Sequence, residues 1–407
     1  MDRRAFLRTS AAAGLLLPFG QAAWALRSDA PGPRFVVIFL RGAVDGLNVV
    51  VPYSEGVYYD YRPTIAVAPP GSEDGVRDLD GRFGLHPALS GLMGLWQQRQ
   101  LAFVHACGSP DPDRSHFEAQ AYMETATPGV PRTTTGWMNR LAGAMQLTVP
   151  SQTVAFGASA PLIVRGTTPV ATFATGRAAA QPQPIDRDPV RRAFDPLYAQ
   201  DPRLAPVWRA AEEARAKLLA DLKHDMMAAS EGAPDAQGFA TDARHGARMM
   251  VADPAVRLVF FQLGGWDTHV NQGAAQGQLA GHLKGLADGL LALHSGLGSI
   301  WSQTAVLVIS EFGRTAHENG DRGTDHGHGN VHWLLGGQLS GGKVYADWRG
   351  LAPEALHQER DLPVTTDFRS LIALVLARHL KLSADALKNV LPGFTPDYRN
   401  IAGLLPA

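Results

Sequence analysis

Ionisable side chains gather in one short segment of the sequence, residues 311–329, which reads EFGRTAHENGDRGTDHGHG. This segment holds five candidate site residues: Glu311, Arg314, Asp325, His326 and His328. A run such as Asp-His-Gly-His-Gly is unsuited to apolar packing, because buried charges need partners. Carboxylates and imidazoles at this spacing can converge on a divalent cation. The segment therefore predicts one side of a metal site, with an arginine close to it.

Three further polar clusters follow apolar runs elsewhere in the chain. Asp45 lies in LRGAVDGLN, where ligation and a turn before glycine explain the residue equally well. Asp267 and His269 lie in GGWDTH, and Asp-x-His on an extended segment points both side chains to one side, which favours ligation. Ser115 begins SHFEAQ, where it either caps a helix together with Glu118 or acts as a metal-activated nucleophile at a helix N-terminus.

The segments around these clusters read as an α/β fold. Continuous apolar runs predict buried strands at residues 34–40, 101–105, 256–263, 304–310 and 331–337. Residues 278–302 form the amphipathic helix expected as a crossover between parallel strands. We therefore predict a doubly wound, mostly parallel sheet flanked by helices. In such a sheet the carboxyl ends of the strands lie along one edge, so the four polar clusters should meet there.

Two segments stand apart from this pattern. Residues 1–25 carry Arg3-Arg4, a short apolar run and the A-x-A signal ending at Ala25, which predicts a cleaved twin-arginine signal peptide. The apolar run is well short of the ~20 residues that a membrane span needs. We expect a periplasmic or secreted protein, carried by the twin-arginine export machinery, whose domain spans residues 26–407. Residues 173–253 read as a helical insertion in that domain and a candidate cover for the site.

The composition narrows the classes of partner and cofactor. The chain has 407 residues, of which 45% are hydrophobic, and a formal net charge of −1, so no basic surface points to nucleic acid or membrane lipid. Its single cysteine, Cys107, excludes an internal disulfide and a thiolate zinc cluster. Oxygen and imidazole ligands suit zinc first, with manganese or iron as alternatives, and the number of candidates allows one ion or two.

In combination, the motifs resemble an exported family catalogued as domain of unknown function 1501. The resemblance rests on the twin-arginine start and on LRGAVDGLN, SHFEAQ, GGWDTH, SEFGRT and DHGHG, and it covers nearly the whole mature chain. That family in turn resembles the alkaline phosphatase and sulfatase superfamily in fold and motif order. The resemblance implies that Asp45 is a metal ligand, that Ser115 is the nucleophile, and that Asp267 and His269 are a ligand pair.

The same resemblance identifies one departure. Glu311 stands where an adjacent Asp-His pair is usual, and the next residue is Phe312. The resemblance then implies that Asp325, His326 and His328 supply the missing ligands.

Two functions stay open at this point. The first is an exported metal-dependent hydrolase or transferase that acts on a phosphate, sulfate or related ester, small or glycan-linked, through a metal-activated serine or water. Arg314 would stabilise the anion or form an ion pair with Glu311 or Asp325. The second is a non-catalytic, metal-bound periplasmic structural or interaction protein, which the altered pair Glu311-Phe312 favours. A serine hydrolase is disfavoured because the chain has no G-x-S-x-G elbow around Ser115.

Overall fold

The computed structural model describes residues 32–130, 133–157, 160–173 and 238–406. The described residues from Pro33 onward belong to one compact unit. The predicted signal peptide and most of the predicted insertion lie outside the described residues. None of the described helices is both long enough and apolar enough to span a bilayer.

A nine-stranded sheet runs through the described part of this unit, in the order β11-β5-β10-β9-β1-β8-β6-β7, with β12 also paired to β5. Its strands are β1 (Arg34–Leu40), β5 (Leu101–Gly108), β6 (Thr153–Phe156), β7 (Ala171–Phe173), β8 (Leu258–Leu263), β9 (Thr304–Ser310), β10 (Asn330–Gly336), β11 (Val344–Tyr345) and β12 (Thr366–Asp367). Only β10 runs against its neighbours β5 and β9. The predicted mostly parallel α/β sheet is confirmed, and each predicted strand is present with nearly its predicted bounds.

The central strand β1 shows why these runs are apolar without alternation. Its side chains point in turn to two separate clusters of buried residues, one on each face of the sheet. Val36, Ile38 and Leu40 join one cluster, and Phe35, Val37 and Phe39 join the other. Helices cover both faces, so neither set of side chains reaches water, as is usual for parallel sheets.

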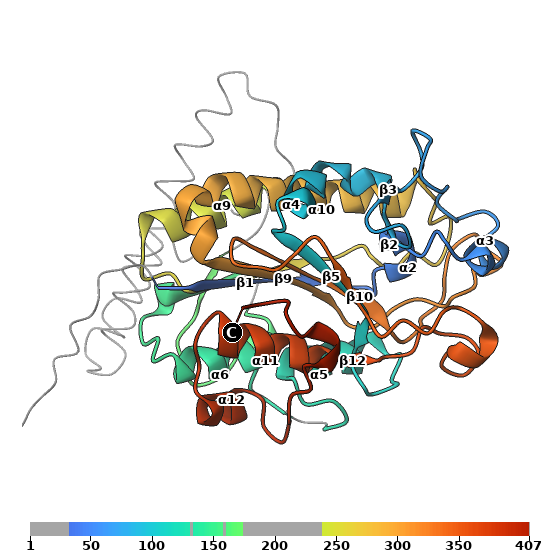
Figure 1. Ribbon diagram of the computed structural model, residues 1–407. Helices are drawn as coiled ribbons and strands as arrows, with labels where there is room; N and C mark the ends of the chain where they lie inside the picture. The colour runs from blue at the N-terminus through green and yellow to red at the C-terminus, as the bar shows by residue number, and fades with distance from the viewer. Residues whose placement is uncertain (1–31, 131–132, 158–159, 174–237, 407) are drawn as a thin grey trace, which may run out of the picture. The chain divides into compact units, whose positions relative to one another are not determined.

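Helices lie on both sides of the sheet (Figure 1). One face is covered by α4 (Met93–Gln97), α9 (Phe239–Ala252) and α10 (Gln278–Leu297), and the other by α5 (His116–Thr125), α6 (Trp137–Ala144), α11 (Phe368–Arg378) and α12 (Ala384–Val390). A smaller sheet, β2-β4-β3, is formed by β2 (Val50–Val51), β4 (Gly84–Leu85) and β3 (Arg77–Asp78), close in the chain to the short helices α2 (Gly46–Val49) and α3 (Gly56–Tyr61). Short 3-10 helices include η1 (Pro87–Leu92), η6 (Gly298–Gln303) and η7 (Pro353–Ala355).

Two helices differ from their sequence patterns. The amphipathic segment after His86 forms η1 and the short α4 instead of one α-helix, and Gly91 and Gly94 within it disfavour the α conformation. His86 caps η1, with its Nδ1 accepting from the backbone N–H of Ala88 at 3.1 Å. The crossover helix α10 ends at Leu297, and Gly298 follows with a positive φ of 52°.

The C-terminal part of the predicted insertion belongs to the body of the fold. It forms α9, which packs against α10 on one face of the sheet. Phe239, Ala243, Ala247 and Met250 of α9 are buried in the same apolar cluster as the inner face of α10. Residues 174–237, the larger part of the predicted insertion, lie outside the described residues.

Candidate metal centre

The strands β1, β5, β8 and β9 run in one direction, so their carboxyl ends share one edge of the sheet. At this edge Leu40 of β1 pairs with Leu263 of β8 and with Ser310 of β9. The loops that follow are in direct contact, since the N–H of Gly42 donates to Oε1 of Glu311 at 2.8 Å. This is the edge at which the sequence places the polar clusters.

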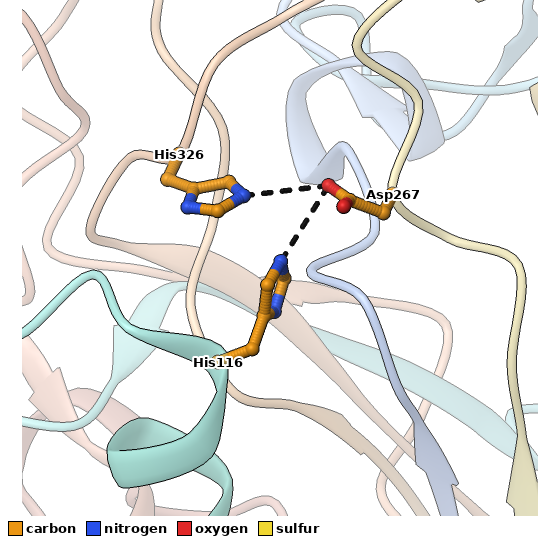
Figure 2. A group of neighbouring side chains, drawn as sticks. All are labelled: His116, Asp267 and His326. Carbon is orange, nitrogen blue, oxygen red and sulfur yellow. Dashed lines mark hydrogen bonds and ion pairs between the residues drawn. The ribbon is translucent and has the colours of Figure 1, made fainter.

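Three side chains from three of these loops converge on one point (Figure 2). His116 is the first residue of α5, Asp267 follows β8, and His326 precedes β10. One ligand atom from each lies within 4.8 Å of the others. Oδ1 of Asp267 is 3.5 Å from Nε2 of His116 and 3.4 Å from Nε2 of His326. No other group of this kind is present among the described residues.

His269 adds a fourth side chain to this group. Its Nε2 lies 2.9 Å from Oδ1 of Asp267 and 3.0 Å from Nε2 of His326. Three imidazoles and one carboxylate are a donor set that suits a tetrahedral zinc ion, in which three or four protein ligands are common. We call His116, Asp267, His269 and His326 the metal cluster.

The outer nitrogen of each histidine faces an oxygen. Nδ1 of His116 lies 2.7 Å from Oε1 of Glu311, and Nδ1 of His326 lies 2.9 Å from the carbonyl oxygen of Arg114. Nδ1 of His269 lies 3.5 Å from Oδ1 of Asp325. Such contacts hold the proton on Nδ1 and turn the lone pair of Nε2 inward, as they do around metal-bound histidines.

Nε2 of His116 is the clearest example of an imidazole nitrogen that faces the centre of the cluster. This nitrogen is buried and has no hydrogen-bond partner among the described residues. The hydrogen bond to Glu311 raises the pKa of His116 above its usual value, although burial of the ring acts against it. Because buried polar atoms are rarely left without a partner, this nitrogen indicates that a ligand belongs in front of it.

Glu311 supports the cluster from behind and is not one of its convergent members. Its side chain is fully buried, and Oε1 accepts from Gly42 N, from Nδ1 of His116 and from Nε2 of Gln120 at 2.8, 2.7 and 2.9 Å. Burial alone would raise the pKa of Glu311. The hydrogen bonds from His116 and Gln120 outweigh burial and hold that pKa below its usual value. Glu311 is therefore an ionised acceptor that orients His116.

Arg314 has the corresponding role for Asp267. Its guanidinium is buried and donates from Nη2 to Oδ1 of Asp267 at 2.6 Å, and not to Glu311 or Asp325. The same guanidinium donates from Nε to the carbonyl of Ala43 at 2.6 Å. Burial would raise the pKa of Asp267, but the hydrogen bond and charge of Arg314 lower it.

Two glycines let these loops approach closely. Gly42 has a φ of +115°, and a Cβ on it would lie 2.8 Å from the backbone nitrogen of Asp267. A Cβ on Gly313 would lie 1.9 Å from the carbonyl oxygen of Gly329. The glycines of LRG and EFG are thus needed because backbone segments pass where a side chain would stand.

Two residues predicted from the sequence as ligands lie in other surroundings. Asp45 is fully buried, and its carboxylate accepts from Nη1 and Nη2 of Arg62 at 2.6 and 3.1 Å and from Nε2 of Gln272 at 2.7 Å. His328 is also buried, and its ring lies against that of His357, with 4.7 Å between centroids. Neither is a member of the metal cluster.

Ser115 adjoins the cluster through the chain, because His116 and Arg114 are its neighbours. It occupies the N-cap position of α5, but its side chain makes no capping hydrogen bond, so the capping box with Glu118 is not formed. The backbone N–H of Ser115 donates instead to Oδ1 of Asp113 at 2.7 Å. Its hydroxyl is on an exposed residue.

His116 is the cluster member that the sequence patterns did not single out as a ligand. The segment SHFEAQ predicts a helix start with a candidate nucleophile at Ser115, and nothing in that pattern marks the histidine as a ligand. A signal was present in the spacing: His116 and Gln120 are four residues apart on a helix and therefore share a face. Both donate to the same oxygen of Glu311.

Comparisons with known proteins place the chain in a family but reveal little about the site. The sequence profile described as "Protein of unknown function (DUF1501)" matches residues 33–391. No curated protein matches the chain significantly.

Similar solved structures share few residues with the chain. The C-terminal periplasmic domain of EcEptC from Escherichia coli, in complex with Zn, is 12% identical over 92% of both chains, with a TM-score of 0.41. The Ps i-CgsB structure in complex with k-i-k-neocarrahexaose is 11% identical over 77% of this chain and 68% of that chain, with a TM-score of 0.35. The lipoteichoic acid synthase LtaP from Listeria monocytogenes is 10% identical over 78% of this chain and 67% of that one, with a TM-score of 0.29. Likenesses this distant carry no argument about the site.

Proposed function

Because this chain belongs to the DUF1501 family, whose function is unknown, we propose its activity from the site itself: a metal-dependent hydrolase or transferase that acts on a phosphate, sulfate or related ester. One observation carries the proposal. Nε2 of His116 is buried, has no hydrogen-bond partner among the described residues, and faces the same point as Asp267 and His326, with Oδ1 of Asp267 3.5 Å away and Glu311 behind the ring.

The donor set fits a zinc ion, and His116, Asp267, His269 and His326 are the residues that would hold it. A bound zinc ion would supply Lewis-acid stabilisation of a developing oxyanion and would lower the pKa of a bound water or hydroxyl. Manganese and iron accept the same donors.

The supporting residues fix the cluster before any ligand arrives. Glu311 orients His116, the carbonyl of Arg114 orients His326, and Arg314 holds Oδ1 of Asp267. Preorganised donors of this kind need little rearrangement in a transition state, which is where electrostatic catalysis draws its advantage. The proposal therefore assigns Arg314 to positioning and not to contact with the substrate.

Ser115 is the nucleophile that this proposal favours, with an activated water as the other possibility. Its hydroxyl is exposed and is not used for capping, and the residue lies beside His116 at the N-terminus of α5. The partial positive charge at a helix N-terminus favours an anion or a developing alkoxide there.

The contacts support one ion rather than two. A second ion held by Asp45 would have to compete with Arg62, whose guanidinium already binds both carboxylate oxygens in a fully buried ion pair. Breaking such a pair costs about 3–5 kcal/mol. Export by the twin-arginine route, and so a periplasmic or secreted location, stays part of the proposal on the strength of residues 1–25.

A non-catalytic metal-bound protein is the second candidate, and one contact favours it. The ring of Phe312 lies 5.0 Å from the rings of both His116 and His326, centroid to centroid, and so forms an apolar wall behind the cluster. That wall leaves no polar group at the position where the resemblance expects another ligand.

Metal analysis combined with a panel of chromogenic phosphate and sulfate esters separates the two candidates. The proposed enzyme would contain about one zinc per chain and would turn over at least one ester, with a loss of roughly 10²-fold or more in Ser115→Ala if the serine attacks. His326→Ala should lose both metal and turnover. Bound metal without turnover of any ester would favour the structural protein.

A further inference from the structure

Beside the metal cluster lies a group of polar side chains that the proposed chemistry does not use: Arg114, His328 and His357. They come from the loop after β5, the loop before β10 and the turn after η7. The rings of His328 and His357 face each other, with 4.7 Å between centroids and an interplanar angle of 37°. The group adjoins the cluster through Arg114, whose carbonyl oxygen holds Nδ1 of His326 at 2.9 Å.

One nitrogen of Arg114 and one of His357 lack hydrogen-bond partners among the described residues. Nε of Arg114 and Nε2 of His357 are buried and have no hydrogen-bond partner in the described part of the chain. The His328 residue is 7% exposed and packs its ring against that of His357. Burial lowers the pKa of His328, and Arg114 is close enough for the guanidinium charge to lower it further. Because at least nine in ten buried polar groups are normally paired, two such nitrogens on neighbouring side chains indicate a site that is complete only with a ligand.

The chemistry of these nitrogens selects the ligand. No carboxylate or third imidazole joins His328 and His357 in a cation-holding group among the described residues, and the guanidinium of Arg114 would repel a cation. Arginine always donates, and a neutral imidazole donates from one nitrogen, so the group suits an acceptor. An oxygen of a phosphate or sulfate group accepts such bonds, and arginine matches its geometry well.

The surrounding charges are nearly balanced. Arg114 and Arg360 share the buried carboxylate of Asp361, with nitrogen–oxygen distances of 2.5 and 3.0 Å. Asp111 supplies one further negative charge close enough to act on His328. An anion would therefore be held by directed hydrogen bonds more than by net charge.

The turn that presents His357 is strained. Gln358 and Glu359 have φ values of 56° and 53°, which side chains other than glycine rarely adopt. The turn is closed by the N–H of Arg360 donating to the carbonyl of His357 at 3.2 Å, and Oε1 of Gln358 accepts from Nη2 of Arg114 at 2.8 Å. Strain of this kind persists where surrounding contacts impose it, and here one such contact joins Gln358, the residue after His357, to Arg114.

We propose that Arg114, His328 and His357 form an oxyanion subsite next to the metal cluster, which binds a phosphate or sulfate group of the substrate. The part that concerns the substrate rests on the proposed function. The part that concerns anion binding does not, because the subsite contains no member of the metal cluster.

Calorimetric titration with inorganic phosphate and sulfate, on zinc-loaded and zinc-free protein, tests the subsite. His357→Phe keeps the ring and removes its nitrogens, and it should weaken binding of the anion roughly tenfold, the loss expected for one hydrogen bond to a charged group. His317→Phe is the matched control, because His317 is exposed and its ring stacks on Tyr61 rather than on a subsite residue. Arg114→Lys, which keeps the charge and loses Nε–H, is the second variant.

The expected result is weaker anion binding in His357→Phe and Arg114→Lys, with zinc affinity unchanged in His357→Phe and both affinities unchanged in His317→Phe. The subsite is overturned if the wild type binds neither anion in either metal state, or if both subsite variants bind it as the wild type does. Failure of the proposed function gives a different outcome: no zinc is bound, while anion binding still depends on His357 and Arg114.

Discussion

Replacing Glu311 by glutamine tests the arrangement of the metal cluster most directly. The carboxylate is fully buried and its Oε1 accepts from Nδ1 of His116 at 2.7 Å, so it fixes the direction of Nε2 without being a convergent ligand itself. Glutamine has nearly the same shape and keeps an oxygen acceptor. The substitution therefore removes mainly the charge behind His116.

The size of the effect follows from this contact. A hydrogen bond to a charged group contributes about 1.5–3 kcal/mol and a neutral one about 0.5–1.5 kcal/mol, so the loss is about 1–2 kcal/mol. That corresponds to a decrease in zinc affinity of roughly 5–30-fold. Changes in the groups behind metal-bound histidines usually cost about 10–100-fold, a range that overlaps this one.

The assay is competition for zinc against a chromogenic chelator at constant pH, with thermal unfolding to show that each variant is folded. Asp45→Asn is the matched comparison, because it removes another fully buried carboxylate near the same edge of the sheet. Asp45 is paired with Arg62, so its replacement should lower the unfolding temperature and leave the zinc affinity unchanged. If Glu311→Gln bound zinc as tightly as the wild type while Asp45→Asn bound it more weakly, the assignment of these two carboxylates would be reversed.

Three further outcomes are expected. Burial lowers the pKa of His105 and His332 to about 4, so both rings are neutral in the folded protein. The folded protein therefore keeps its full stability above about pH 6.5 and loses about 3 kcal/mol for each histidine as pH falls toward 4. Urea unfolding at pH 7.5 and pH 4.5 should show this loss. Gly42→Ala should lower the free energy of unfolding by about 2 kcal/mol or more. Gly81 also has a positive φ but has open space around it, so Gly81→Ala should lower that free energy by only about 1–2 kcal/mol. Equal shifts in thermal unfolding would contradict the close contact between Gly42 and Asp267. Burial raises the pKa of the Cys107 thiol, so a thiol reagent should react only on unfolding, and fast reaction with the native protein would contradict this.

The sheet could be predicted because its signals are local. Uninterrupted apolar runs identified β1 and β9 with their observed bounds, and the crossover helix identified the parallel pairing between strands. The end of α10 was predicted at residue 302, five residues too late, because the apolar pattern continues past Leu297 into η6. Gly298, at the end of the helix, decides where the α conformation stops, and the apolar periodicity alone does not predict that end.

The site was only partly predictable because packing decides which side chains converge on one point. Asp267, His269 and His326 were expected as ligands and lie together, while Glu311 and Asp325 were expected as ligands and lie behind histidines. Nothing in a local sequence distinguishes a carboxylate that reaches the centre from one that stops at an imidazole. That difference is set by loops from other strands.

Asp45 and Arg62 are a second case in which the sequence does not reveal the partner of a carboxylate. The sequence places a carboxylate at the end of β1, where a ligand is expected, but its partner Arg62 lies seventeen residues later, in a segment that reads as surface connection. In the folded chain Arg62 is fully buried, and it also donates to the carbonyls of Ala316 and Thr315 at 2.9 and 2.8 Å. The arginine therefore ties the loop after β1 to the loop after β9, and the carboxylate of Asp45 balances its charge. A cation in the same place would leave Arg62 buried without a counter-ion, and this is the physical reason to expect one metal ion at this edge rather than two.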